Sequence, residues 1–513
     1  MQVTGRKRTG SAGAAVRNTL LHASGIVVQF LAGAVSAVML ARALGPTMMG
    51  AYSFFLVLVA LLLAPACFGI PSTLTKYIAA ALGRGELPTA LGLTRWLIRV
   101  QVLTTVGVTL LCIAAVWLFG RSEHPELTIL ALLIVVPLAL REGLLGILSG
   151  LQRYDVVATS ALCTALVQVV CIGAASLLHA GLRGMLLATL LAVMVGAGAT
   201  HWLTRGPMRQ RMGEVAAPIP ADLRRTLWRF AATVFYTILL YMILWRRSEV
   251  LFLNYYSTAV QVAFYSVSFS LVEKLEALGT SLSSVLLPMT SETYGRQGLD
   301  KLGPLLINSV RYLQIAVVPL CFTGAALAGP LVRLTFGDPF LPMVPVLRTL
   351  LLMLAPSCLG LLAYVFLMAI DRQAFVVRLS TVLALVNLLL AALVIPASGA
   401  LGAAWVKLTV QVTTTGISLV YLARIVGAAL PWRSLVKVYA AAALATLPML
   451  AAQWLEAGSL ALAGSLAGGL LLYAGLLRAL GEVGEKEITV TRAAFLGLLY
   501  REPPASAASD MLP

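Results

Sequence analysis

The sequence predicts an all-α, polytopic membrane protein of about 14 transmembrane helices, in two pseudo-repeated lobes of about six helices each and a C-terminal helix pair. Three observations support this class. The 513-residue chain is 60% hydrophobic and only 11% charged, whereas soluble domains carry roughly a quarter charged residues. Apolar runs of about 20 residues, each long enough to cross the hydrocarbon core, follow one another almost from end to end. Similar short segments also recur in the same order, roughly 215 residues apart.

The recurring segments are turn and kink signals rather than charged motifs. Each match is weak alone, but a shared order at nearly one spacing is better evidence than any single match. A repeat of this length in so apolar a chain predicts two packed membrane lobes with a site between them. The matched segments are 50–54 with 263–267, 181–184 with 399–402, and Pro71 followed by Tyr77 with Pro288 followed by Tyr294.

Turn and charge signals place the individual helices. Pro71 is expected to kink the second of them, because a proline inside a helix removes a hydrogen bond. Lobe one, 19–204, is expected to hold helices at 19–41, 51–81, 93–119, 127–150, 156–178 and 184–204. Lobe two, 229–423, is expected to hold helices at 229–253, 260–286, 306–327, 344–369, 374–395 and 400–423, and the segment 424–478 adds a pair at 434–455 and 459–478.

The distribution of basic residues predicts the topology. Lys and Arg collect in a tail at 1–18, in the linker at 205–228 and in alternate connections, and such residues mark the cytoplasmic side. An even number of helices then leaves both termini in the cytoplasm, with the chain end at 479–513 as a second tail. We expect a multi-pass protein of the cytoplasmic (inner) membrane.

Composition also excludes several classes of function. The net charge of +17 is explained by these basic connections, so no nucleic-acid partner is expected. The six cysteines lie singly in apolar runs and indicate neither disulfides nor a metal site. The chain has no phosphate-binding loop, zinc-ligand spacing or nucleophile elbow. We therefore predict a protein that is not an enzyme and has no catalytic residues, metal or cofactor beyond a coupling ion.

The informative residues are charges inside the predicted spans, because an ionisable group in hydrocarbon costs several kcal/mol and usually faces a partner or a watery cavity. The deep charges are mostly cationic, which suits an anionic substrate such as a diphosphate-linked lipid. The candidate substrate-binding residues are Arg141, Lys76, Lys407, Arg246, Arg247, Lys274 and Arg311. The candidates for binding a coupling ion are Glu142, Glu249, Glu273 and Glu276.

Structural explanations stay open for several of these residues. Lys76 and Arg311 lie near enough to an interface for their side chains to reach water. Glu273, Lys274 and Glu276 lie within one helical turn, where an ion pair that only fixes helix packing is an equal alternative.

The chain resembles the polysaccharide flippases of the multidrug/oligosaccharidyl-lipid/polysaccharide exporter superfamily over about residues 15–430. The resemblance implies 14 helices, lobes that rock between inward- and outward-facing states, and translocation of undecaprenyl-diphosphate-linked oligosaccharides. It also implies coupling to protons or sodium. Family members often carry an aspartate near the start of the seventh helix, where this chain has Glu249 behind Arg246 and Arg247. The similar segments are 41–46 with 50–53, 69–71 with 74–79, 140–145 with 150–154, 263–266, 346–348, and 395–396 with 399–404.

The sequence therefore predicts a transporter that flips a polyprenyl-diphosphate-linked oligosaccharide repeat unit across the membrane for surface polysaccharide assembly. Its expected partners are the lipid-linked oligosaccharide, membrane lipids and polysaccharide polymerase machinery, and we expect a monomer. A lipid II flippase and a multidrug exporter of the same superfamily are alternatives, although a drug exporter is expected to carry more carboxylates than cations. A membrane-embedded glycan ligase or polymerase is the alternative from another class.

Overall fold

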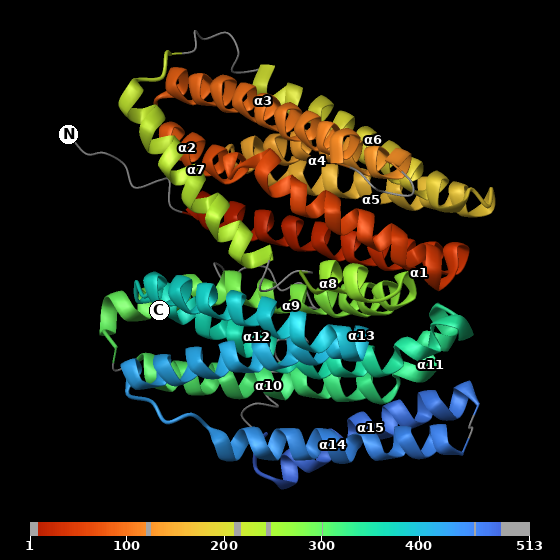
Figure 1. Cartoon of the computed structure of the whole chain (residues 1–513). Coiled ribbons are helices and arrows are strands. Elements are labelled where there is room, and N and C mark those ends of the chain that lie inside the picture. Colours follow the sequence, from red (N-terminus) through yellow and green to blue (C-terminus); the bar gives the residue numbers. More distant parts are fainter. Residues whose placement is uncertain are drawn as a thin grey trace, which may run out of the picture.

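The computed structural model describes residues 9–119, 125–209, 217–242, 248–299, 301–455 and 458–483. These residues form helices and connections and contain no strand. Figure 1 shows two stacked layers of helices, with the N-terminal half of the chain in one layer and the C-terminal half in the other. The all-α class is confirmed. The predicted tail at 1–18 is described only from residue 9, and the tail at 479–513 only as far as residue 483.

Lobe one is built around α1, whose length exceeds one membrane crossing. Gly45 has φ 66° and ψ 175° inside α1, a backbone conformation that only glycine adopts readily, and the chain reverses there (Figure 1). The kink expected at Pro71 is present: Phe68 and Gly69 both have positive φ, and Pro71 stands in the first turn of the following helix. The helices are α1 (Thr9–Cys67), α2 (Ile70–Gly83), α3 (Leu87–Phe119), α4 (Pro125–Gly150), α5 (Tyr154–Leu177) and α6 (Gly181–Arg209).

Lobe two also contains a long, kinked helix, α13, which by the predicted repeat corresponds to α5 and α6 of lobe one. Gly399 has φ 54° inside α13, and the side chain of Gln261 accepts a hydrogen bond of 2.9 Å from the freed N–H of Ala400. Gly181, the predicted repeat partner of Gly399, also has positive φ and begins α6. The helices are α8 (Ser248–Tyr256), α9 (Ala259–Gln297), α10 (Leu302–Ala326), α11 (Ala328–Thr335), η2 (Asp338–Met343), α12 (Val344–Ala369) and α13 (Gln373–Val426).

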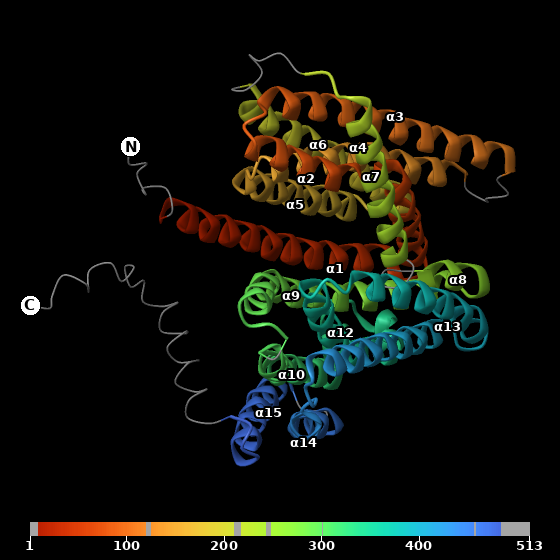
Figure 2. The ribbon, with the colours of Figure 1, turned by 90° about the vertical axis from the view of Figure 1, so that its left-hand side faces the viewer.

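Helix α7 (Ala221–Tyr241) connects the two lobes. Within the predicted helix at 229–253, the structure describes α7 as far as Tyr241 and α8 from Ser248, and residues 243–247 lie outside the described residues. Figures 1 and 2 show α7 crossing the lobe-one helices at a steep angle. Its aromatic residues pack on lobe one: Phe68 stacks on Phe235 at 4.9 Å between ring centroids, and Trp228 lies edge-on to Phe68 and Trp96. The rings of α7 therefore pack on lobe one, but α7 also contacts α13 of lobe two, where the hydroxyls of Tyr236 and Thr381 lie 3.2 Å apart. Helix α8 packs on α13 and α9 of lobe two.

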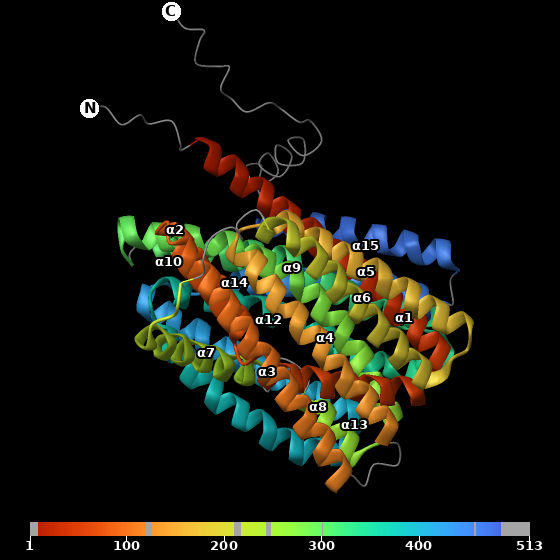
Figure 3. The same ribbon diagram turned by 90° about the horizontal axis from the view of Figure 1, so that it is seen from above.

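The last two helices, α14 (Trp432–Trp454) and α15 (Ser459–Ala479), pack on α10 at the edge of lobe two. Figure 3 shows α15 at the border of the molecule. Ion pairs and hydrogen bonds join the chain just after α15 to α10 and α14. The buried Glu482 accepts hydrogen bonds from Arg311 at 3.0 Å and Ser434 at 2.6 Å, and Lys437 lies 3.5 Å from its other carboxylate oxygen. Arg311, a predicted substrate contact, is thus held by a carboxylate at the end of α15.

The surface of the helices is apolar enough for a membrane. Within the described residues, ten helices are long and apolar enough to cross a bilayer. Large apolar side chains such as Leu103, Leu111 and Trp117 on α3 are 71–80% exposed. The count of fourteen crossings stays a prediction, since α1 and α13 each contain a reversal and α9 carries three adjacent charges. The chain is a multi-pass membrane protein.

Candidate functional site

The two lobes meet most closely where α1 packs against α9. A Cβ added to Gly50 of α1 would overlap the backbone carbonyl of Ala259 at the start of α9, so these two helices touch through their backbones. Further along the same pair, a Cβ on Gly33 would lie 2.8 Å from the ammonium of Lys274. Lys274, a predicted substrate contact, therefore sits in the contact between the lobes.

Arg42 adds a polar bond between the lobes near the turn at Gly45. Its Nε and Nη2 donate hydrogen bonds of 2.7 and 2.6 Å to the carbonyls of Thr335 and Leu334 at the end of α11. The last carbonyls of a helix have no partners within it and carry partial negative charge, so a guanidinium is a fitting cap. Arg42 is not among the residues that the sequence predicts to have a role.

Replacing Arg42 by glutamine is expected to shift the protein several-fold toward states in which the lobes are apart at this end, since the bond exists only while they touch. Spin labels at the exposed positions Thr47 and Leu334 would report the lobe separation. Arg333→Gln is the matched control, because Arg333 pairs with Asp338 within the same lobe. Unchanged distance distributions in the Arg42 variant would show that this bond does not hold the lobes.

A cavity of about 660 Å³ lies between the lobes. Lobe one contributes the second half of α1, the start of α2 and Glu142 of α4, and the opposite side comes from the end of α7, from α8 and from Leu388 of α13. The lining is mainly aliphatic, with Ser72, Tyr241 and Ser248 as polar members. Among the described lining residues Glu142 is the one that carries a charge. Met242 and Ser248, which flank 243–247, also line the cavity, whereas Arg246 and Arg247 lie outside the described residues.

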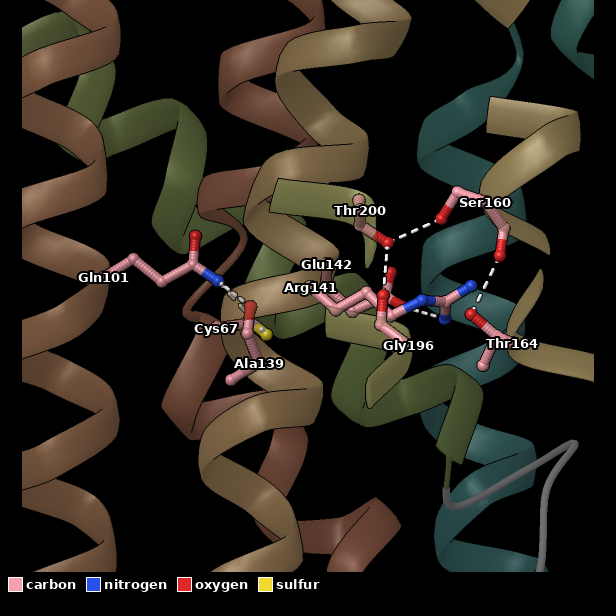
Figure 4. A network of polar contacts seen from close by, with 9 residues as sticks. All are labelled: Cys67, Gln101, Ala139, Arg141, Glu142, Ser160, Thr164, Gly196 and Thr200. Atoms are coloured by element: carbon pink, nitrogen blue, oxygen red, sulfur yellow. Dashed lines mark hydrogen bonds and ion pairs between the residues drawn. The ribbon is translucent and has the colours of Figure 1, made fainter. Parts of the chain in front are cut away.

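Arg141 and Glu142 are neighbours on α4 whose charged groups lie close together but have different surroundings. Glu142 lines the cavity, while the Arg141 side chain runs toward a hydroxyl cluster of α5 and α6 (Figure 4). In that cluster the hydroxyls of Ser160 and Thr200 lie 2.5 Å apart. The Arg141 guanidinium is 90% buried and 3.9 Å from the Glu142 carboxylate, and its Nε has no hydrogen-bond partner among the described residues. The Glu142 carboxylate at the cavity wall thus has the buried cation of Arg141 beside it.

The break between α1 and α2 is stabilised by side chains of α3. Thr104 and Thr105 donate hydrogen bonds of 2.9 and 3.3 Å to the carbonyl of Ala66, which lies in the last turn before the break. The side chain of Gln101 bonds the Ala139 carbonyl of α4 (Figure 4). The two threonine bonds satisfy a carbonyl beside the break, and the Gln101 bond joins α3 to α4 near Glu142. Nothing in the sequence pattern singled out these three polar residues.

Lobe two contains a buried ion pair. Lys407 of α13 is 2% exposed and Glu249 of α8 is fully buried, and Lys407 Nζ lies 3.4 Å from one carboxylate oxygen of Glu249. The hydroxyl of Tyr265 on α9 donates a 3.1 Å hydrogen bond to the other oxygen. The Lys407 ammonium also lies 5.4 Å from the centroid of the Phe269 ring. Lys407 is a predicted substrate contact and Glu249 a predicted ligand of a coupling ion, and the structure pairs them with each other.

The remaining described candidates are not among the residues that line the cavity. Lys76 is exposed on α2, with its ammonium 4.1 Å from the ring centroid of Phe230 on α7, a cation–π distance. Glu273 and Glu276 are half-buried on α9 beside Lys274. Substrate binding by these residues stays a prediction. Within the described residues no group of His, Cys, Asp and Glu is arranged to hold a metal ion.

Residues 15–294, more than half of the chain, match the family described as polysaccharide biosynthesis proteins. The chain belongs to this family. No curated protein matches it. Among solved structures, the lipid II flippase MurJ in an inward closed conformation is similar, with a TM-score of 0.69 and 13% identity, covering 90% of this chain and 99% of MurJ.

Two further structures of one transporter superfamily share the fold. An inward-facing multidrug resistance MATE transporter of the MOP superfamily has a TM-score of 0.63 and 15% identity, covering 80% of this chain and 98% of its own. A MOP superfamily transporter from Pyrococcus furiosus, titled as having a binding pocket of reverse polarity, has a TM-score of 0.56 and 16% identity over 81% of this chain and 95% of its own. At these identities the likeness establishes the fold, which is that of membrane transporters.

Proposed function

We propose that this protein flips a polyprenyl-diphosphate-linked oligosaccharide repeat unit across the cytoplasmic membrane by alternating access, without a chemical step on the substrate. The observation that carries the proposal is the cavity of about 660 Å³ between two lobes that touch through α1 and α9. A site between two lobes is accessible from alternate sides when the lobes rock against each other. Membership of a polysaccharide biosynthesis family supports the substrate class.

The diphosphate of the substrate needs cationic contacts, and we assign them to Arg246 and Arg247. The support is their position in the chain, between the cavity-lining residues Met242 and Ser248. The aliphatic lining suits the first isoprene units next to the diphosphate. Charge distribution supports cytoplasmic termini, and the Gly45 turn then faces outward, with the lobes in contact on that side.

Filling the cavity is the direct test. Ala60 of α1 is exposed and lines the cavity, so Ala60→Trp is expected to lower transport of a fluorescent polyprenyl-diphosphate oligosaccharide into proteoliposomes at least fivefold. Leu111→Trp is the matched control, since Leu111 is 71% exposed on the outer face of α3. Equal transport by both variants would contradict a substrate path through this cavity.

Testing a second substrate distinguishes the proposed function from its main alternative. The structural likeness to a lipid II flippase makes lipid II the second candidate, because it shares the diphosphate and the polyprenyl chain and differs in the sugar. Proteoliposomes that move lipid II in preference to the oligosaccharide would assign the protein to cell-wall synthesis. Movement of a cationic dye alone would favour a drug exporter.

A further inference from the structure

The buried pair of Lys407 and Glu249 lies in the interior of lobe two, within the membrane-spanning helices. The two residues come from α13 and α8 and are 2% and 0% exposed. A carboxylate in such a place must be protonated or must have a cation beside it, since an isolated charge in an apolar interior is very costly. That cation is either an ion that diffuses in and out or a group belonging to the protein.

The structure supplies the cation from the chain itself. The ammonium of Lys407 lies 3.4 Å from one oxygen of Glu249, while Tyr265 donates to the other oxygen at 3.1 Å. Next to the carboxylate, the Ser248 hydroxyl accepts a 3.1 Å hydrogen bond from the Asn387 side-chain amide. The Glu249 carboxylate is therefore held from two sides, by the Lys407 ammonium at one oxygen and by the Tyr265 hydroxyl at the other, and its charge is balanced by a group of the protein.

The repeat shows that the fold does not require this charge. Tyr52 is the counterpart of Tyr265, and Thr189 stands at the repeat position of Lys407. In lobe one the hydroxyls of Tyr52 and Thr189 lie 2.8 Å apart and are buried. A neutral hydrogen bond therefore occupies in lobe one the place that the charged cluster occupies in lobe two.

We propose that Lys407 is a built-in counter-cation that takes the place of a diffusible coupling cation at Glu249. The cation at this site in lobe two is then part of the protein throughout the transport cycle, and no cation from solution binds there. Glu142, which lines the cavity, is the carboxylate that remains open to protons or ions from water. The inference rests on the proposed transport function, but not on the identity of the substrate.

Lys407→Thr copies the residue that lobe one has at the equivalent position. It leaves the Glu249 carboxylate, the Tyr265 hydroxyl and a new threonine hydroxyl together, a set of hard oxygen ligands that suits an alkali cation. We expect the full-length wild-type protein, purified in detergent, to show the same unfolding temperature in sodium chloride and in choline chloride of equal ionic strength. Lys407→Thr is expected to be stabilised by sodium with a saturable dependence, and Lys407→Thr/Glu249→Gln is expected to lose that response.

Two results would overturn the proposal. One is a sodium-specific stabilisation of the wild-type protein that Glu249→Gln removes, which would mean that an ion binds there despite Lys407. The other is a folded Lys407→Thr variant without any sodium response. If Lys407→Thr does not fold, the neutral double variant Lys407→Met/Glu249→Gln is used in its place, and transport is measured with and without sodium. The proposal is contradicted if transport by the wild type depends on sodium and the double variant loses that dependence. It is supported if both proteins transport independently of sodium. Because unfolding is measured without substrate, a failure here is distinct from failure of the proposed function.

Discussion

Replacing Glu249 by alanine is expected to lower the free energy of unfolding by about 3–5 kcal/mol, because the ammonium of Lys407 is then left in the interior without its partner. Unfolding of the purified protein in detergent, followed by tryptophan fluorescence, measures the loss. Glu292→Ala is the matched control. Glu292 also pairs with a cation, Arg296 at 2.9 Å, but its side chain is 59% exposed, and such surface pairs contribute little.

A double variant separates the charge from the packing. Glu249→Gln/Lys407→Met removes both charges while keeping similar side-chain volumes, so we expect it to recover most of the lost stability. If the double variant is as unstable as Glu249→Ala, the cost comes from packing rather than from an unpaired charge. If Glu249→Ala is as stable as the wild type, the pair is not buried as the structure places it.

Gly50→Val is expected to reduce transport more than tenfold, because a side chain at this position collides with the backbone of Ala259 and forces α1 away from α9. Overpacking of a tight contact costs about 1–3 kcal/mol, and here the strain falls on the contact between the lobes. Proteoliposome transport and the spin-label distance between Thr47 and Leu334 would measure the two consequences together.

Gly107→Val provides the control for introducing a β-branched residue into a helix. Gly107 lies within α3, and an added Cβ there would meet nothing within 4 Å. Both variants carry the same change in helix propensity, from glycine to a β-branched residue, so only the clash differs between them. Wild-type transport by Gly50→Val would show that the α1–α9 contact is not needed during the cycle.

The sequence was sufficient to predict what depends on composition and spacing along the chain. The all-α membrane class and the family are confirmed, and Gly181 and Gly399, which the predicted repeat pairs, both have positive φ at the start of a helical stretch. These features are local, since a glycine turn or an apolar run acts within its own neighbourhood.

The direction of a side chain around its helix was not predictable. Arg141 and Glu142 are adjacent on α4 and their charged groups lie 3.9 Å apart, yet the Arg141 side chain is buried in lobe one while Glu142 lines the cavity. The partner of a deep charge was hidden for a related reason: Glu249 and Lys407 lie far apart in sequence, and only the fold brings them together. The cap that Arg42 forms on α11 leaves no pattern in the sequence, because backbone carbonyls accept the bonds.

The packing of α7 changes which parts of the chain form a mechanical unit. The covalent linker ends before α7, but the ring contacts of Phe68, Trp96, Trp228 and Phe235 fasten α7 to lobe one. A protein cut in the connection between α6 and α7 therefore keeps α7 bound to lobe one without a covalent bond. Two fragments divided there are expected to assemble through this aromatic contact when they are made together in one membrane.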